Sequence, residues 1–305
     1  MKNKPIYVEL PIKSSIDEVW SRTQEPKLHE QWDLRFSSIE YLPKKSEDEP
    51  QSFLYETKIG FGVKVAGWGK SVGTANKKDG SKTSSLHFGT DQKISPIREG
   101  KGYWRYIPKG DEIIFLTQYD YQVRYGFIGR ILDFFFRPMM GWATALSFDV
   151  LKRWIEIGES PRAQYVRFFM TSLLSVFFFL IWFYQGLVPK LMAKHSDEVA
   201  MLSNLTSLDE SLALITVGII GVLEMLFGFV WLFYRKKRHL FAIQMIVFPI
   251  LTVMALIASP TIAVHPFNPI TFNASLWVLS IIGYILAADV PTAASCKRSR
   301  KGESV

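Results

Sequence analysis

The sequence has very little cysteine and none of the common catalytic motifs. Cys296 is the only cysteine among 305 residues, which excludes an intrachain disulfide. No group of histidines and cysteines has the spacing of metal ligands, so we expect no metal ion. The G-x-S-x-G, P-loop and C-x-x-C motifs are also missing. The sequence therefore indicates no cofactor of its own and leaves open whether the protein is an enzyme.

The first ten residues, MKNKPIYVEL, lack the apolar stretch of a secretion signal. We therefore expect the amino-terminal half to stay in the compartment where it is made. The formal net charge of +8 could suggest a nucleic-acid partner. The distribution of lysine and arginine around apolar segments accounts for this charge, and we expect no nucleic-acid binding.

Charged residues become scarce in the second half of the chain. From Phe168 onward they occur only in short clusters between long apolar runs. A helix needs about 20 residues to cross a hydrocarbon core of about 30 Å. Four segments are long enough, namely residues 168–188, 211–234, 240–258 and 270–288. We predict a soluble domain followed by a bundle of four transmembrane helices.

The basic residues predict the orientation of these helices, because cytoplasmic loops keep an excess of lysine and arginine. Clusters precede the first segment, join the second to the third and follow the fourth: Lys152, Arg153, Arg162 and Arg167, then Arg235, Lys236, Lys237 and Arg238, then Lys297, Arg298, Arg300 and Lys301. We predict a multi-pass plasma-membrane protein with both termini in the cytoplasm. Residues 160–167 would be a juxtamembrane linker and residues 291–305 a basic tail.

Residues 1–159 are expected to form an α+β domain. Ser15 to Glu18 have the S-x-x-E capping-box pattern, so a helix should begin there, after a strand at residues 6–10. Apolar and polar residues alternate from Ile113 to Tyr125, which predicts a strand with one buried face. Apolar residues at spacings of three and four predict a helix over residues 127–156, kinked near Pro138, that covers this face.

This order of elements resembles the SRPBCC superfamily of START-like and polyketide-cyclase-like domains. The resemblance covers about residues 4–159 and includes SSIDEVW, ISPIREGKGYWRYIP and RPMMGWATALSFDVLKRWIE. It implies a helix-grip fold with an apolar cavity between the sheet and the long helix, suited to a lipid, an isoprenoid or a polyketide-like molecule. The expected lining is Tyr119, Tyr121, Tyr125, Trp142 and Phe148. Alternatively, these rings fill a solid core.

The second half resembles the DoxX-like family of four-helix membrane proteins over about residues 167–289. The matching features are YQGLVPKLM at residues 184–192, Glu224 in the second helix, and SPTIAVHPFNPITFN at residues 259–273. The family is related to membrane oxidoreductase subunits that interact with quinones. As one interpretation, the resemblance implies that the bundle has a redox partner and interacts with a quinone.

The polar residues of the membrane half define a second expected site: Glu224, Lys190, Gln244, His265 and Asn273. An ionisable group inside a membrane helix costs at least about 2.5 kcal/mol and usually faces a partner. Gly221 and Gly228 share a helix face with Glu224, so a neighbouring helix could approach it closely. Glu224 could relay protons, contact a polar headgroup or simply hold the bundle together. His265 could be a ligand or part of a rigid turn.

Two classes of function remain. The first is a membrane-anchored protein whose cytoplasmic domain binds a hydrophobic small molecule, such as a lipid, isoprenoid or quinone, next to the bilayer. The alternative is an enzyme: an oxidoreductase subunit or quinone-interacting protein acting through the bundle, or a cyclase-like or hydrolase-like enzyme in the cavity. No set of residues shows the proximity that catalysis requires, which favours binding.

Overall fold

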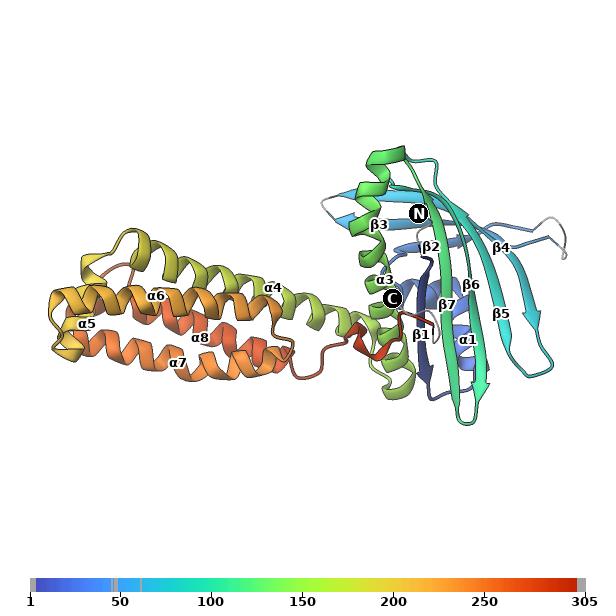
Figure 1. The fold of residues 1–305 in the computed structure, drawn as a ribbon. Helices are drawn as coiled ribbons and strands as arrows, with labels where there is room; N and C mark the ends of the chain where they lie inside the picture. The colour runs from blue at the N-terminus through green and yellow to red at the C-terminus, as the bar shows by residue number, and fades with distance from the viewer. Residues whose placement is uncertain (1–3, 45, 47–48, 61, 301–305) are drawn as a thin grey trace. The chain divides into compact units, whose positions relative to one another are not determined.

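The computed structural model describes residues 4–44, 46, 49–60 and 62–300. The chain divides into two units, residues 1–164 with 291–305, and residues 165–290 (Figure 1). The first unit contains an antiparallel sheet and a long helix, and the second unit is helical. The predicted fold classes of the two halves are therefore confirmed.

The first unit is built on one antiparallel sheet in the order β1-β7-β6-β5-β4-β3-β2. Its strands are β1 (Ile6–Ile12), β2 (Ser38–Tyr41), β3 (Ser52–Gly60), β4 (Val63–Asn76), β5 (Lys82–Gly89), β6 (Ile97–Lys109) and β7 (Glu112–Val123). Strands β2 to β7 form a meander. Strand β1, the first in the chain, pairs antiparallel with β7, so Ile6 lies opposite Tyr119. The alternation predicted for β7 is seen, since Phe115, Thr117 and Tyr119 are all buried.

Three helices complete the first unit. Helix α1 (Ile16–Gln24) begins at the predicted cap, where the Ser15 hydroxyl accepts a hydrogen bond of 3.2 Å from the Glu18 N–H. Helix α2 (Pro26–Trp32) follows directly, with its proline in the first turn. Helix α3 (Gly126–Ile157) is one continuous helix through Pro138 and lies across the sheet (Figure 1).

The two halves of α3 have different environments. In the second half, Phe148 is fully buried and stacks on Phe115 with 4.5 Å between ring centroids. In the first half, Leu132 and Phe135, which their spacing predicted to face the sheet, are each about half exposed or more, whereas Met139 lines a cavity. The predicted stripe is wrong there. The side chains on the sheet side of this half are Phe136, Met140 and Ala143, which line a cavity instead of a solid core.

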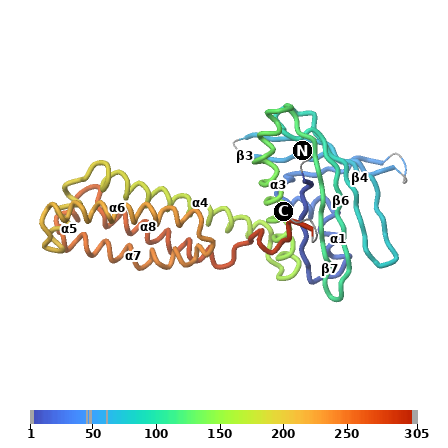
Figure 2. Tube along the Cα trace, viewed as in Figure 1, coloured from blue at the N-terminus to red at the C-terminus, as the bar shows by residue number. Residues whose placement is uncertain are grey.

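The end of the chain packs against the first unit. Glu9 of β1 and Lys297 exchange two backbone hydrogen bonds of 2.9 and 2.8 Å, so the tail extends the sheet at its β1 edge (Figure 2). The buried Asp149 carboxylate accepts from the Thr292 N–H at 2.7 Å and from the Ser295 hydroxyl at 2.6 Å. The segment expected as a basic tail is therefore structured over residues 291–300, and residues 301–305 lie outside the described part of the chain.

Cys296 lies within this docked segment. Its thiol donates a hydrogen bond of 3.2 Å to the Ala145 carbonyl, and burial raises the pKa of the thiol to about 12. The thiolate is the reactive form of cysteine, so this geometry makes Cys296 a poor nucleophile.

Docking of the tail predicts an unusual response to proteolysis. When an engineered protease site between Gly158 and Ser160 is cut in detergent, we expect the first unit to remain bound to the helical unit. Each tail hydrogen bond contributes about 0.5–1.5 kcal/mol, and several act together. The same cut in a chain that ends at residue 290 should release the first unit. If size-exclusion chromatography shows that the first unit is released from the cut full chain, the tail does not keep the two units together.

The second unit contains α4 (Pro161–Gln185), the π-helical segment η1 (Gly186–Met192), α5 (Ser196–Thr206), α6 (Glu210–Phe233), α7 (Lys237–Ala258) and α8 (Pro269–Leu286). Four stretches are long and apolar enough to cross a membrane: Pro161–Met192, Glu210–Phe233, Lys237–Ala258 and Pro269–Leu286. These confirm the four predicted segments. The first begins earlier than expected, since Pro161 opens the helix and most of the expected linker 160–167 is helical.

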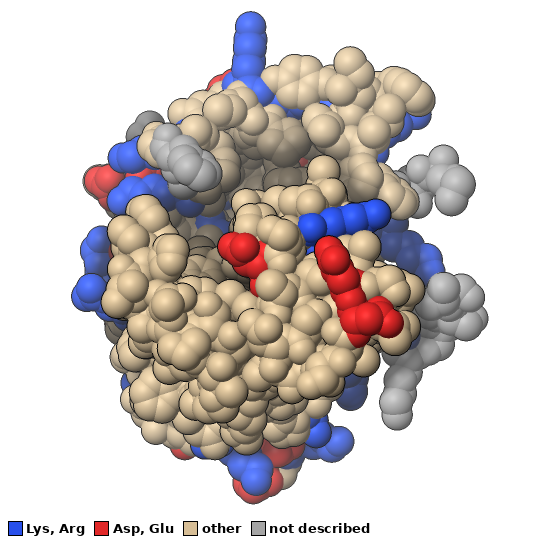
Figure 3. Space-filling view, turned by 90° about the vertical axis from the view of Figure 1, so that its left-hand side faces the viewer, with Lys and Arg blue, Asp and Glu red and all other residues tan. Residues whose placement is uncertain are grey.

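Large apolar side chains are exposed along these helices, among them Leu173, Leu223 and Ile246. The surface that faces the viewer in Figure 3 is mostly uncharged, with a few charged side chains. The interior is aromatic: Phe178 stacks on Trp231 at 5.1 Å between ring centroids. Exposed apolar side chains around an aromatic interior are what a helical bundle in lipid requires.

Candidate functional site

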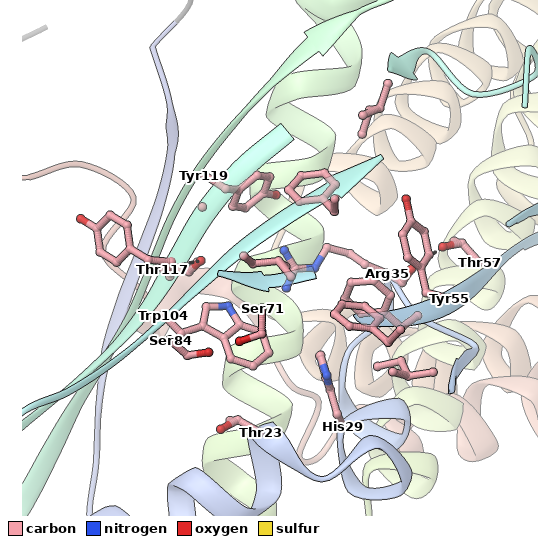
Figure 4. Close-up of a pocket in the computed structure, with 18 of the residues that line it drawn as sticks. Thr23, His29, Arg35, Tyr55, Thr57, Ser71, Ser84, Trp104, Thr117 and Tyr119 are labelled. Carbon is pink, nitrogen blue, oxygen red and sulfur yellow. Dashed lines mark hydrogen bonds between the residues drawn. The ribbon is translucent and has the colours of Figure 1, made fainter. Parts of the chain in front are cut away.

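A cavity of about 750 Å³ lies in the first unit, between the concave face of the sheet and the first half of α3 (Figure 4). Its lining is mainly apolar, including Ile39, Phe53, Val65, Phe88, Trp104, Phe136 and Met140. Hydroxyl groups occur among them, from Tyr55, Thr57, Ser71, Ser84 and Thr117. Apolar walls with a few polar groups are typical of small-molecule sites, whose volumes run from about 300 to 1,000 Å³.

The cavity exists because the inward face of the central strands carries small residues. One row across the sheet runs Ser71, Leu86, Gly102, Tyr119, from β4 to β7. A Cβ atom at Gly102 would lie only 2.4 Å from the Cβ of Tyr119, so the ring of Tyr119 occupies space that any other residue at 102 would need. Ser84 of β5, which lies in the neighbouring row opposite Trp104, also has a small side chain. These strands leave room beneath α3 that their side chains do not fill.

A charged cluster projects into this cavity from the segment after α2. Asp33 caps the end of α2, and its carboxylate accepts two hydrogen bonds from the Arg35 guanidinium, at 2.9 Å from Nε and 2.6 Å from Nη2. The Nε2 atom of His29, one turn earlier, lies 3.1 Å from the same carboxylate. Arg35 and His29 both line the cavity, and Figure 4 shows the guanidinium reaching inward between Tyr55 and Tyr119.

Electrostatics keep the cluster ionised. Burial by itself would raise the pKa of Asp33, but the charge of Arg35 and the hydrogen bonds from Arg35 and His29 lower it well below its ordinary value. Burial would lower the pKa of Arg35, and the Asp33 charge raises it instead. Burial raises the pKa of Tyr55 to about 12, so this hydroxyl stays protonated near neutral pH. The cavity thus contains one ion pair, and hydroxyl groups such as those of Tyr55 and Thr57 donate to backbone carbonyl oxygens of the protein.

The sequence-predicted lining is only partly correct. Tyr119 lines the cavity, and its hydroxyl lies 2.9 Å from that of Thr144 on α3. Tyr121 points instead to Asp133, to which it donates a hydrogen bond of 2.6 Å. Phe148 belongs to the solid core, and Tyr125 and Trp142 are largely exposed at 52% and 37%. The cavity lies nearer β4 and β5 than the sequence suggested, because the small residues are there.

Sequence reasoning missed His29, Asp33 and Arg35. A signal was present in HEQWDLR, since His29 and Asp33 are four residues apart and share a helix face. Nothing local showed that this face meets the cavity rather than solvent. Among the residues that the structure describes, His29 contacts the Asp33 carboxylate and no hydroxyl or thiol nucleophile is hydrogen-bonded to its ring. The geometry therefore supports recognition of a polar group more directly than covalent catalysis.

The predicted polar residues of the helical unit do not come together in a single site. The Lys190 Nζ atom lies 3.1 Å from the Glu224 carboxylate and 3.5 Å from that of Glu198 on α5. Only 9% of Lys190 is exposed. Gln244 instead accepts from the Ser280 hydroxyl at 3.3 Å, and Asn273 donates to Thr252 at 3.1 Å, both between α7 and α8. His265 is exposed in the loop before α8.

Two glycines bring the partner helices of the Lys190–Glu224 pair together. A Cβ atom at Gly221 would lie 2.7 Å from the Gly186 carbonyl oxygen, and one at Gly186 would lie 2.3 Å from that of Gly221. The backbones of η1 and α6 can approach this closely only without side chains at both positions. The π-helical turn of η1, around Pro189, places Lys190 on the α6 side.

Comparisons with known proteins agree with a membrane protein. Residues 179–281 match the DoxX-like family. The chain is 50% identical over 192 residues to the "Uncharacterized membrane protein YndG" of Bacillus subtilis, and the match covers 61% of this chain and 70% of that protein.

Three solved structures have a distant likeness to about half of this chain. The STAR-related lipid transfer protein from Xanthomonas axonopodis has a TM-score of 0.38 at 18% identity, covering 48% of this chain and 82% of its own. The aromatase/cyclase StfQ from the steffimycin biosynthetic pathway has a TM-score of 0.39 at 12% identity, covering 50% and 51%. Norcoclaurine synthase from Thalictrum flavum has a TM-score of 0.34 at 14% identity, covering 51% and 98%.

Proposed function

We propose that this chain, which belongs to the family of the Bacillus subtilis membrane protein YndG, binds a hydrophobic small molecule in the cavity of its first unit, next to the bilayer that its four helices span. The observation that carries the proposal is the 750 Å³ cavity with mainly apolar walls. A lipid, an isoprenoid or a quinone is of suitable size and polarity.

The energetics of the cavity support an occupant. An empty apolar space of this size forfeits the dispersion contacts of its lining, whereas an apolar molecule restores them. Burial of apolar surface contributes roughly 25 cal/mol per Å². Side chains of low volume at Ser71 and Ser84 maintain this space, although larger apolar residues at these two positions would give a denser core.

Mass spectrometry of apolar extracts tests the proposal. The full chain is purified in mild detergent, and the same detergent without protein provides the background. We expect one defined class of apolar molecule to be retained in a constant ratio to protein. Recovery of the bulk lipid mixture alone, in its membrane proportions, would contradict the proposal.

We also propose that the membrane is the plasma membrane and that both chain ends are cytoplasmic. The segment before the first span and the segment after the fourth belong to the same unit, which requires an even number of crossings. The positively charged residues between α6 and α7, Arg235 and Lys236, support a cytoplasmic position for that loop. A reporter fused after residue 305 that is active only outside the cell would contradict this topology.

A further inference from the structure

The cavity contains a guanidinium whose hydrogen-bonding capacity Asp33 does not exhaust. Arginine has five N–H groups, and the Asp33 side chain takes two of those on Arg35. The Tyr119 hydroxyl lies close enough to influence the pKa of Arg35 and can accept a hydrogen bond from a third N–H group. Donors therefore remain on a side chain that is only 12% exposed. Buried polar groups are nearly always hydrogen-bonded, so an occupant should supply acceptors.

The charge of the cluster restricts what that acceptor can be. The Asp33 carboxylate is fully buried and balances the charge of Arg35 at 2.6 Å. The charges of the Asp33 carboxylate and the Arg35 guanidinium therefore sum to zero. An anionic occupant would add a buried charge without its own counterion, which is costly, whereas a neutral carbonyl oxygen would not. Two lysines, Lys44 and Lys58, also line the cavity. Both are exposed and cannot compensate the charge of an anion at Arg35.

The surrounding groups favour an occupant with one polar end. Thr57 donates to the Arg35 carbonyl at 2.5 Å, and Thr117 donates to that of Tyr103 at 3.2 Å. The Ser84 hydroxyl donates to Gln24 at 3.4 Å. These hydroxyls are engaged with the protein itself. The aromatic rings of Phe36 and Tyr119 lie 5.6 and 5.4 Å from the Arg35 guanidinium carbon and flank its site.

We propose that the occupant is an uncharged amphipathic molecule whose carbonyl-type acceptor, as in an ester, a ketone or an amide, binds Arg35 while its hydrocarbon part fills the cavity. This inference rests on the proposed binding function and adds the ligand class. Asp33 acts as a positioning residue, since its bidentate contact fixes the guanidinium plane. His29 completes the set of hydrogen-bond partners of the Asp33 carboxylate.

A series of probes that share a sixteen-carbon chain tests the ligand class. The probes are added to the delipidated full chain in detergent. The probes are hexadecane, methyl palmitate and palmitate, with binding measured by native mass spectrometry. A hydrogen bond to a charged donor contributes enough for about a tenfold preference. We expect methyl palmitate to bind at least tenfold more tightly than the other two probes. The double substitution Asp33→Asn with Arg35→Gln should abolish this preference, and Arg98→Gln, at an exposed position, should preserve it.

The outcomes separate the inference from the function on which it rests. Equal binding of all three probes would leave the cavity as a hydrophobic site and overturn the role of Arg35. Tightest binding of palmitate, lost in the double variant, would overturn the requirement for a neutral ligand and show a positively charged cluster. Binding of none of the probes would overturn the proposed function, and the ligand class with it. Thermal unfolding of the double variant checks that it is folded, because Asp33→Asn keeps the side-chain volume but Arg35→Gln shortens the side chain, and the pair of substitutions removes both charges.

Discussion

Tryptophan at both Ala143 and Ser84 is expected to abolish retention of the apolar molecule. Ala143 is on the α3 wall of the cavity and Ser84 is on the β5 wall, so the two indole rings enter the same space from opposite sides. Each single substitution should reduce the retained ligand, and the pair should reduce it by at least tenfold, or about 1.4 kcal/mol. The measurement is the ligand-to-protein ratio in apolar extracts of the full chain.

The control for added bulk is Ile131→Trp, which places an indole on the exposed side of the same helix. This variant should retain ligand as the wild type does. The filled cavity should also raise the melting temperature of the delipidated protein, because the new rings gain dispersion contacts that the empty space lacked. Undiminished ligand in the double variant would place the binding site elsewhere in the molecule.

Replacement of Lys190 by methionine is expected to destabilise the helical unit strongly. The change removes the cation 3.1 Å from the Glu224 carboxylate and leaves that carboxylate inside the bundle with no counterion. Removal of one partner of a buried ion pair costs about 3–5 kcal/mol, and the contact of Lys190 with the partly exposed Glu198 places this pair toward the lower end of that range. Unfolding by a denaturing detergent measures the loss.

Two variants distinguish the ion pair from the loss of a lysine as such. Lys190→Met combined with Glu224→Gln removes both charges and should recover most of the lost stability. Lys194→Met changes an exposed lysine four residues away and should have little effect. If the double variant is as unstable as Lys190→Met, the ion pair is not the cause. If Glu224→Gln alone changes ligand retention, Glu224 contributes to binding as well as to the bundle.

Local sequence signals predicted the elements but not the contents of the cavity. The capping box at Ser15, the alternation in β7 and the four apolar segments each depend on neighbouring residues, and the structure has all of them. The space beneath α3 depends on small residues that β4, β5 and β6 bring into adjacent rows. No window of sequence contains such a row, so prediction from β7 alone placed too many aromatic rings at the site.

The same limit applies to contacts between distant residues. Glu9 and Lys297 are 288 positions apart, and their pairing gives structure to a segment that the sequence indicated only as a basic tail. Asp33 and Arg35 are close in sequence, but the sequence does not show whether the turn after α2 faces the cavity or solvent. The glycines on one helix face with Glu224 predicted that a neighbouring helix approaches it closely, and the structure has Lys190 3.1 Å from its carboxylate.

Photochemical cross-linking tests the central claim most directly, because it locates the occupant. The full chain, in detergent, is loaded with a methyl ester of a fatty acid that carries a diazirine at mid-chain, irradiated, and digested for peptide mass spectrometry. The account predicts labelled peptides from the first half of α3 and from β3 to β6, with labelling lost in the Ala143→Trp, Ser84→Trp double variant. Labelling confined to α4, α6, α7 and α8, and unchanged in that variant, would contradict it.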